Sequence, residues 1–207
     1  MVDRPGTGKK VSLIGAPLGF GAGKPGSELG VAAIRLASIR NKRLIDLIRE
    51  LGYEATDVGD VDIITPANAA GDHDNPRYLQ ETIASCTNIA ASVHSALSNG
   101  AIPVILGGDH SIAIGSFSGV SSYFRERDEQ CGLIWFDAHA DINTPESSSS
   151  GNIHGMPLAV LLGYGDEGLT GIGGFSPKLD PRFCAHVGAR DLDEGERSKI
   201  NELGMRG

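Results

Sequence analysis

The stretch Ile102–Ser111 reads IPVILGGDHS, a short hydrophobic run that stops at two glycines and three polar residues. A hydrophobic run of this length, bounded by glycine, is typical of a buried strand. The stretch Gly132–Asp141 has the same form: it reads GLIWFDAHAD, and its polar residues begin where the hydrophobic run ends. The middle of the chain is therefore predicted to contain two buried strands, each followed by a polar loop.

The segments around these two strands alternate between strand and helix patterns. Further strands are expected at 11–16, 53–58 and 183–187, and helices at 31–51, 111–125, 156–162 and 193–203. Another helix is expected to begin at Asn75-Pro76, as N-cap and first helical residue, because hydrophobic residues then recur at steps of three and four up to Leu97. This alternation predicts a three-layer α/β/α fold with a mostly parallel sheet, as a single domain over residues 1–207.

The composition excludes several classes of protein. The chain has 207 residues, of which 40% are hydrophobic, so it can bury a sizeable core. A net charge of −8 argues against nucleic-acid binding through a basic surface, and no run of 18 hydrophobic residues predicts a membrane span. The polar N-terminus does not resemble a secretory or transit segment. Three widely spaced cysteines indicate reduced thiols, so we expect a cytoplasmic protein.

The polar residues after the two central strands predict a metal site. Ligands of parallel sheets bind beyond the carboxyl ends of the strands, where His110 and the segment after Phe136 lie. In an extended segment alternate residues point to one side, so Asp137, His139 and Asp141 are expected to converge. Two carboxylates and two imidazoles suit Mn²⁺ or a similar divalent ion better than a structural zinc site. Either motif alone is common as a turn or cap; together they favour a metal site.

The loop that follows the second motif predicts a substrate site. Ile142–His154 reads INTPESSSSGNIH, and a structureless connector of this length is unusual inside a compact domain. Asn143, Ser150 and Asn152 can bind a carboxylate or an α-amino group. His154 can transfer protons near neutral pH.

These motifs resemble the arginase branch of the ureohydrolase family. GGDHS and the long segment DAHADINTPESSSSGNIHGMPLA match it without gaps, and VGARDLDEGE (187–196) and the IGAP strand match more loosely. The agmatinase branch shares the metal motifs but has a different loop after the second motif. The resemblance covers nearly the whole chain. It implies an arginase-like fold and a hydrolase with two Mn²⁺ ions that converts L-arginine to L-ornithine and urea, in a homo-oligomer (trimer or hexamer).

The resemblance also implies residue roles. His110, Asp137 and Asp141 would bind one manganese ion, and Asp137 would bridge to a second ion held by His139. Asp141 would also accept a hydrogen bond from a metal-bridging hydroxide that attacks the guanidinium carbon.

The remaining roles implied by the resemblance concern the substrate. His154 would transfer the proton. Asn143 and Ser150 would contact the α-carboxylate, and Asp193 and Glu196 would hold the α-amino end. Asn152 and His139 would also bind the substrate. Acidic residues at the start of a helix are, however, more often simple caps.

The sequence departs from the family in one respect. The family completes its metal sites with an Asp-x-Asp on a later strand, and neither Asp60/Asp62, nor 72–74, nor Asp191/Asp193 is a good counterpart. We therefore expect a chain that lacks the last strands of the sheet and that is metal-poor and inactive by itself. Two alternatives remain: another ureohydrolase, such as an agmatinase, and a non-catalytic arginase-like protein that acts through association with a partner.

Overall fold

The computed structural model describes residues 8–66 and 75–205, so the segment 72–74 considered above lies outside the described residues. The strands are β1 (Lys10–Ala16), β2 (Ser38–Ile39), β3 (Lys42–Arg43), β4 (Glu54–Asp60), β5 (Ala101–Gly107), β6 (Leu133–Phe136) and β7 (Cys184–Val187). The α-helices are α1 (Gly30–Leu36), α2 (Leu44–Glu50), α3 (Leu79–Ser98), α4 (Ile112–Arg125), α5 (Pro157–Leu161), α6 (Glu167–Thr170) and α7 (Glu194–Leu203). Short 3₁₀ turns include η1 (Phe20–Ala22) and η3 (Ile153–Gly155).

The main strands pair in parallel, which confirms the predicted fold class. One sheet has the order β4-β1-β5, and a second sheet consists of β6 and β7. The short antiparallel pair β2-β3 forms a separate hairpin. Between the described residues no strand pairing joins β5 to β6, so the two parallel sheets are separate.

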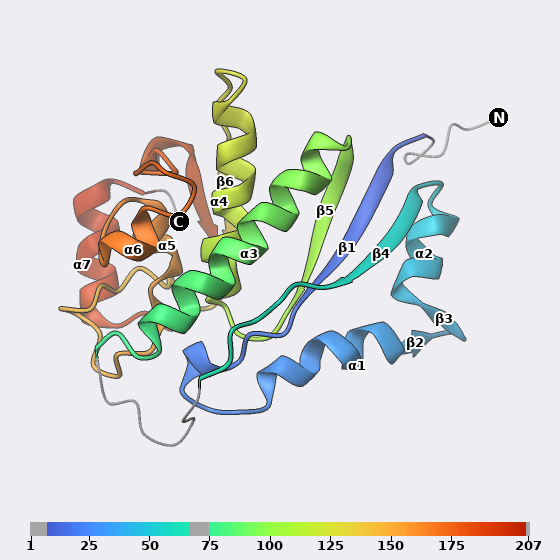
Figure 1. The fold of residues 1–207 in the computed structure, drawn as a ribbon. Helices are drawn as coiled ribbons and strands as arrows, with labels where there is room; N and C mark the ends of the chain where they lie inside the picture. The colour runs from blue at the N-terminus through green and yellow to red at the C-terminus, as the bar shows by residue number, and fades with distance from the viewer. Residues whose placement is uncertain (1–7, 67–74, 206–207) are drawn as a thin grey trace.

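Helices cover both faces of the three-stranded sheet, as Figure 1 shows. Ile14 of β1 packs in one hydrophobic cluster with Ile89 and Val93 of α3. The next residue, Gly15, points to the other face, where an added Cβ would lie 2.8 Å from the Val31 side chain of α1. Because neighbouring residues of a strand face opposite sides, α1 and α3 form two different layers.

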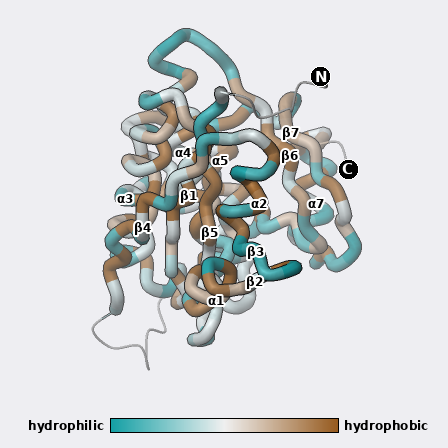
Figure 2. The backbone as a smooth tube through the Cα atoms, turned by 90° about the vertical axis from the view of Figure 1, so that its right-hand side faces the viewer, coloured by the Kyte–Doolittle hydropathy of each residue, from teal (hydrophilic) through white to brown (hydrophobic). Residues whose placement is uncertain are grey.

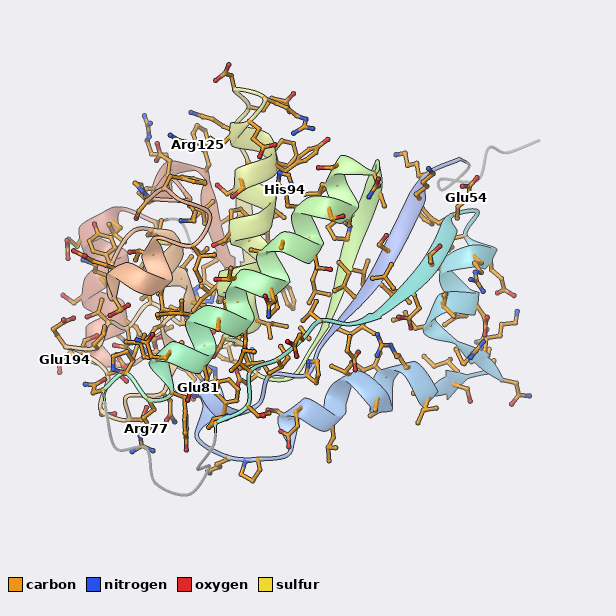
Figure 3. All side chains as sticks on the ribbon, viewed as in Figure 1. Glu54, Arg77, Glu81, His94, Arg125 and Glu194 are labelled. Carbon is orange, nitrogen blue, oxygen red and sulfur yellow. The ribbon has the colours of Figure 1, made fainter. Side chains whose placement is uncertain are left out.

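Helix α4 connects the two sheets. Its residues Ile112 and Val120 pack against the cluster around Ile14, while Ala113 and Phe117 pack against the cluster of β6, α5 and β7. Figure 2 shows the hydrophobic residues concentrated along the strands and inner helices. In Figure 3 charged side chains such as those of Glu54, Arg125 and Glu194 lie on the outside. Because α4 begins directly after the GGDHS loop, it fixes that loop relative to both sheets.

Two predicted helices differ in the structure. The helix expected at 31–51 is broken by the β2-β3 hairpin, whose turn residues Arg40 and Asn41 both have positive φ (54° and 62°), the backbone of a type I′ turn. The helix expected to start at Asn75-Pro76 begins at Leu79, because Tyr78 is left-handed (φ 53°). The Asn75 amide donates a hydrogen bond to the Pro145 carbonyl (2.7 Å) and does not cap the helix.

Hydrophobic residues are exposed on the small sheet. Ile134 and Phe136 of β6 are 72% and 82% exposed, whereas Trp135 between them is buried. Ile102 at the start of β5 is also exposed. Among the described residues, no helix combines the length and the hydrophobicity needed to cross a membrane.

Candidate metal centre

Side chains from the ends of β5 and β6 meet at one point, although these strands do not pair. The Nδ1 atom of His110 lies 2.6 Å from Oδ2 of Asp141 and 3.1 Å from Oδ2 of Asp137. One ligand atom from each of these three residues lies within 4.8 Å of the others. An imidazole nitrogen and two carboxylates are a donor set that fits a divalent ion such as Mn²⁺.

The second oxygen of Asp137 faces the other predicted imidazole. Oδ1 accepts a hydrogen bond from the His139 backbone N–H (3.0 Å) and lies 3.4 Å from His139 Nδ1. The expected extended segment is wrong, because residues 137–139 form a bend and Asp141 has a left-handed backbone (φ 50°). His139 is therefore not part of the cluster of three and meets it only at the second oxygen of Asp137, while its Nε2 lies 3.3 Å from Asp191.

The charges of the cluster are coupled. Burial of the His110 ring lowers its pKa, but the hydrogen bond to Asp141 and the two carboxylate charges outweigh this effect, so the pKa is raised. Burial raises the pKa of Asp137, but the His139 N–H and the charge of His110 outweigh it and lower the pKa overall. The two carboxylates thus favour the protonated form of the His110 ring, and a bound cation would compete with that proton.

The indole ring of Trp135 stacks on His110, with 4.4 Å between ring centroids and 26° between planes. Trp135 is the only tryptophan of the chain. Its fluorescence is therefore a reporter for this single site.

The predicted substrate residues lie in two groups: Asn143, Asp193 and Glu196 in one, and Ser150 and Asn152 in the other. Asn143 donates a hydrogen bond from Nδ2 to Asp193 Oδ2 (2.7 Å), which brings two of them together. Asp193 and Glu196 form a capping box at the start of α7, and burial of Glu196 raises its pKa. Ser150 is exposed and accepts a hydrogen bond from the Asn152 backbone N–H (3.2 Å).

His154 lies in the 3₁₀ turn η3 and is partly buried. It is not one of the three residues that share the metal-sized cluster. Burial raises the pKa of Asp109, and hydrogen bonds from Ser111 and Ala22 and, as the smallest effect, the charge of His154 offset part of this rise.

Three residues at the site were not predicted from the sequence. Trp135 stacks on His110, Asp191 contacts His139, and Asp109 is buried beside His110. The position of Trp135 two residues before Asp137 was a possible signal, since alternation places both on one side of the chain. No pattern in the sequence near Asp191 predicts its contact with His139, because this contact depends on the path of the loop after β7.

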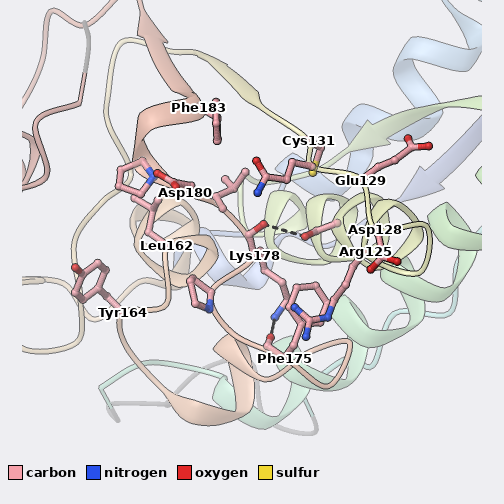
Figure 4. Close-up of a pocket in the computed structure, with 15 residues that line it drawn as sticks. Arg125, Asp128, Glu129, Cys131, Leu162, Tyr164, Phe175, Lys178, Asp180 and Phe183 are labelled. Carbon is pink, nitrogen blue, oxygen red and sulfur yellow. Dashed lines mark hydrogen bonds between the residues drawn. The ribbon is translucent and has the colours of Figure 1, made fainter.

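A cavity of about 830 Å³ lies at the opposite ends of β6 and β7, and none of the three cluster residues lines it. Figure 4 shows its lining residues, among them Cys131, which precedes β6, and Phe183, which precedes β7. Lys178 is buried there, and burial with the charge of Arg125 lowers the pKa of its amine to about 8. Its ammonium group donates hydrogen bonds to the carbonyls of Thr170 and Phe175, so it fastens the loop before β7.

The fold and the cluster define an α/β protein with a candidate metal centre at the carboxyl ends of parallel strands. Comparison with known proteins identifies its family: residues 9–207 match the arginase family, and the chain belongs to that family. It is 41% identical to the arginase of Bacillus caldovelox over 199 residues, which is 96% of this chain and 64% of that protein.

Solved structures show the same relationship. The native structure of the Bacillus caldovelox arginase matches with a TM-score of 0.86, over 96% of this chain and 64% of that chain. An Entamoeba histolytica arginase in complex with L-ornithine is 29% identical, with a TM-score of 0.82, over 97% of this chain and 65% of that one. The chain thus spans somewhat less than two thirds of the length of the relatives that it matches.

Proposed function

We propose that the chain carries the active site of an arginase, which hydrolyses L-arginine to L-ornithine and urea with two Mn²⁺ ions. The observation that supports this proposal most is the environment of Asp137. One carboxylate oxygen lies 3.1 Å from the His110 ring, and the other lies 3.4 Å from the His139 ring. A carboxylate with one imidazole at each oxygen fits a ligand that bridges two ions.

The ligands divide into two sets. His110, Asp137 and Asp141 would hold one ion, and Asp137 with His139 would hold the second. When bound, such a pair supplies a Lewis acid and lowers the pKa of coordinated water. The protein contributes geometry: Asp141 is buried, and the Leu158 backbone N–H donates to its carbonyl (2.9 Å), so the helix that follows fixes its backbone.

The reaction adds water to the guanidinium carbon and breaks the bond between that carbon and the side-chain nitrogen. The electron pair of this bond stays on the nitrogen, which must take up a proton to leave as the ornithine amine. His154 is the side chain in the adjoining loop that can donate this proton near neutral pH. The urea product contains the guanidinium carbon and the oxygen atom of the added water.

The Asn143–Asp193 pair would recognise the amino-acid end of the substrate. Asp193 offers a carboxylate for an α-amino group, and Asn143 and Ser150 offer donors for an α-carboxylate. The solved relative with bound L-ornithine supports an amino acid of this kind as the product. Agmatine lacks the α-carboxylate, so an arginase site should discriminate against it.

Substrate discrimination gives the experiment. We would load the 207-residue chain with Mn²⁺ and measure urea and ornithine from L-arginine, and urea and putrescine from agmatine. The missing Asp-x-Asp predicted a metal-poor, inactive chain. Because His110, Asp137 and Asp141 nevertheless come together, we instead expect weak turnover, of arginine only, and an Asn143→Ala variant with a raised KM for arginine. Asp180→Asn, at the opposite end of β7, is the control and should leave the kinetics unchanged. Preference for agmatine, or bound Mn²⁺ without any turnover, would contradict the proposal; the latter result favours a non-catalytic role with a partner.

The family resemblance also leads us to propose a cytoplasmic homo-oligomer. Cys86, Cys131 and Cys184 are all free thiols, which fits a reducing compartment. Sedimentation velocity of the purified chain should show trimers or hexamers, and a monomer at all concentrations would contradict this part of the proposal.

A further inference from the structure

Asp109, beside the candidate metal ligand His110, is a buried carboxylate with an unusual set of partners. It is 6% exposed, and none of the ion pairs between described residues includes it. Its two oxygens accept hydrogen bonds from backbone N–H groups: Oδ1 from Ser111 (2.9 Å) and Oδ2 from Ala22 (3.0 Å). Burying a carboxylate that has no directly bonded cation is costly, although the charge of His154 offsets part of this cost, and a neutral asparagine or serine could accept the Ser111 bond alone.

The bond to Ala22 joins two loops that are distant in sequence. Ala22 belongs to the turn η1 after β1, and Asp109 belongs to the loop after β5. The backbone N–H of Asp109 also donates to the carbonyl of Leu18 (2.7 Å). An added Cβ at Gly21 would lie 2.1 Å from the Ser111 hydroxyl and 3.0 Å from both Asp109 oxygens, so the two loops are in direct contact.

The same residue, Ala22, continues the link to the substrate loop through its carbonyl. The carbonyl of Ala22 accepts a hydrogen bond from Asn152 Nδ2 (3.1 Å). An added Cβ at Gly23 would lie 2.7 Å from Asn152 Oδ1, which shows how closely the turn approaches this side chain. Asn152 precedes the turn η3 that carries His154. Asp109, Ala22 and Asn152 therefore form a continuous link between the loop of His110 and the loop of His154.

We propose that Asp109 is a positioning residue of the active site. Its carboxylate holds the turn η1 against the metal loop, and through Ala22 and Asn152 it sets the loop of His154 relative to His110. This inference rests on the proposed function, because it assigns Asp109 to the geometry of that same site. A mere local cap of α4 needs only the Ser111 bond, whereas positioning needs both oxygens.

The isosteric variant Asp109→Asn separates these two roles. An amide has one acceptor oxygen, so one of the two backbone N–H groups must face the NH₂ group and lose its bond. The local cap can survive, but the two-sided link cannot. The control is Asp166→Asn, since Asp166 accepts a bond from the N–H two residues ahead (Gly168, 2.8 Å), as Asp109 does from Ser111.

Two measurements test the proposal on the full chain, both well below the unfolding temperature. In Mn²⁺ titrations followed by Trp135 fluorescence, Asp109→Asn should weaken binding by about tenfold, as loss of a ligand's supporting partner commonly does. In hydrogen-exchange mass spectrometry, the same variant should exchange faster both at 20–23 and at 150–155. Asp166→Asn should match the wild type in both measurements.

The outcomes separate the inference from the proposed function. Faster exchange confined to 109–112, or unchanged Mn²⁺ affinity in Asp109→Asn while the wild type binds, would overturn the positioning role. A wild type that binds no Mn²⁺ refutes the proposed function, and the exchange data then still test the link between the loops. Should Asp109→Asn not fold, Gly21→Ala serves in its place: its Cβ pushes the turn from Asp109 without changing a charge, and it should move both readouts in the same direction.

Discussion

The carboxyl ends of β5 and β6 differ sharply from the rest of these two strands. At their ends, His110 and Asp137 lie 3.1 Å apart. Along their lengths the two strands do not pair within the described part of the chain, and Ile134 of β6 is 72% exposed. The site is therefore assembled by the helices and loops that join the strands, and not by hydrogen bonds between them.

The core beneath the site explains how this works. Helix α4 packs on both sheets, and α5 packs under β6, so the two strand ends are held by side-chain packing. Packing of this kind is sensitive to the loss of volume. We therefore expect substitutions to affect stability, metal binding and association differently, according to where they lie. The three places are this core, the cluster of His110, Asp137 and Asp141, and the exposed side of β6.

Leu158→Ala should give the largest loss of stability. Leu158 is fully buried in the cluster of β6, α5 and β7, and its N–H bonds the Asp141 carbonyl. We expect the free energy of unfolding to fall by about 2–5 kcal/mol, measured by chemical denaturation with Trp135 fluorescence. Leu36→Ala is the matched control, because Leu36 is 80% exposed, and it should change stability by less than about 0.5 kcal/mol. Equal effects of both variants would show that α5 does not support the site.

His110→Ala should break the contact between the strand ends without unfolding the protein. We expect Mn²⁺ affinity to fall by about 100-fold or more, because this ring is the ligand contributed from β5. Fluorescence titration measures this, with His94→Ala as the control, since His94 pairs with Glu126 at 3.0 Å away from the site. Mn²⁺ affinity that stays the same in both variants would place the metal elsewhere.

The fold was predictable from the sequence where hydrophobic runs were long. The strands at 11–16 and 102–106 and the helix at 111–125 correspond to β1, β5 and α4. The helix at 31–51 was wrong, because a two-residue turn at Arg40 and Asn41 leaves little trace in residues that also suit a helix. The separation into two sheets was not visible, since strand order depends on contacts between distant segments.

The site was predictable in its residues but not in its local geometry. The spacing of the second motif suggested three side chains on one side of an extended segment. The left-handed backbone of Asp141 and the bend at 137–139 turn His139 away from His110. The partner of His139, Asp191, and the link from Asp109 to Asn152 come from packing between loops, which residue spacing does not encode.

Binding of Mn²⁺ should strengthen as the pH rises, because the raised pKa of His110 keeps a proton where the metal binds. Each pH unit below this pKa should weaken binding by up to about tenfold. The stability of the metal-free fold has the opposite dependence. The stabilisation from the His110–Asp141 pair is complete at pH values below the pKa that His110 has in the unfolded chain, and it is lost as the pH rises through the raised pKa that His110 has in the folded chain. Mn²⁺ titrations and unfolding at pH 6 and 8.5 check both signs, and parallel trends would contradict this account.

Ile134→Lys should have the smallest effect on stability and tests the open side of β6. Unpaired strand edges with exposed hydrophobic residues promote association, and a lysine opposes it. We expect less concentration-dependent association in light scattering, with unfolding changed by less than about 0.5 kcal/mol. Leu51→Lys is the comparison, because Leu51 is 55% exposed but lies at the end of α2 and outside any strand, and it should not reduce association. Equal effects would show that association does not depend on the exposed side of β6.

Anomalous X-ray diffraction at the manganese absorption edge tests most directly whether the carboxyl ends of β5 and β6 form one metal-binding site. Crystals of the chain grown with Mn²⁺ should show an anomalous peak at coordinating distance from His110 Nδ1, Asp137 Oδ2 and Asp141 Oδ2. A second peak is expected between Asp137 Oδ1 and His139. A map with manganese bound only elsewhere, and none between these side chains, would contradict the claim that the two strand ends form one metal centre.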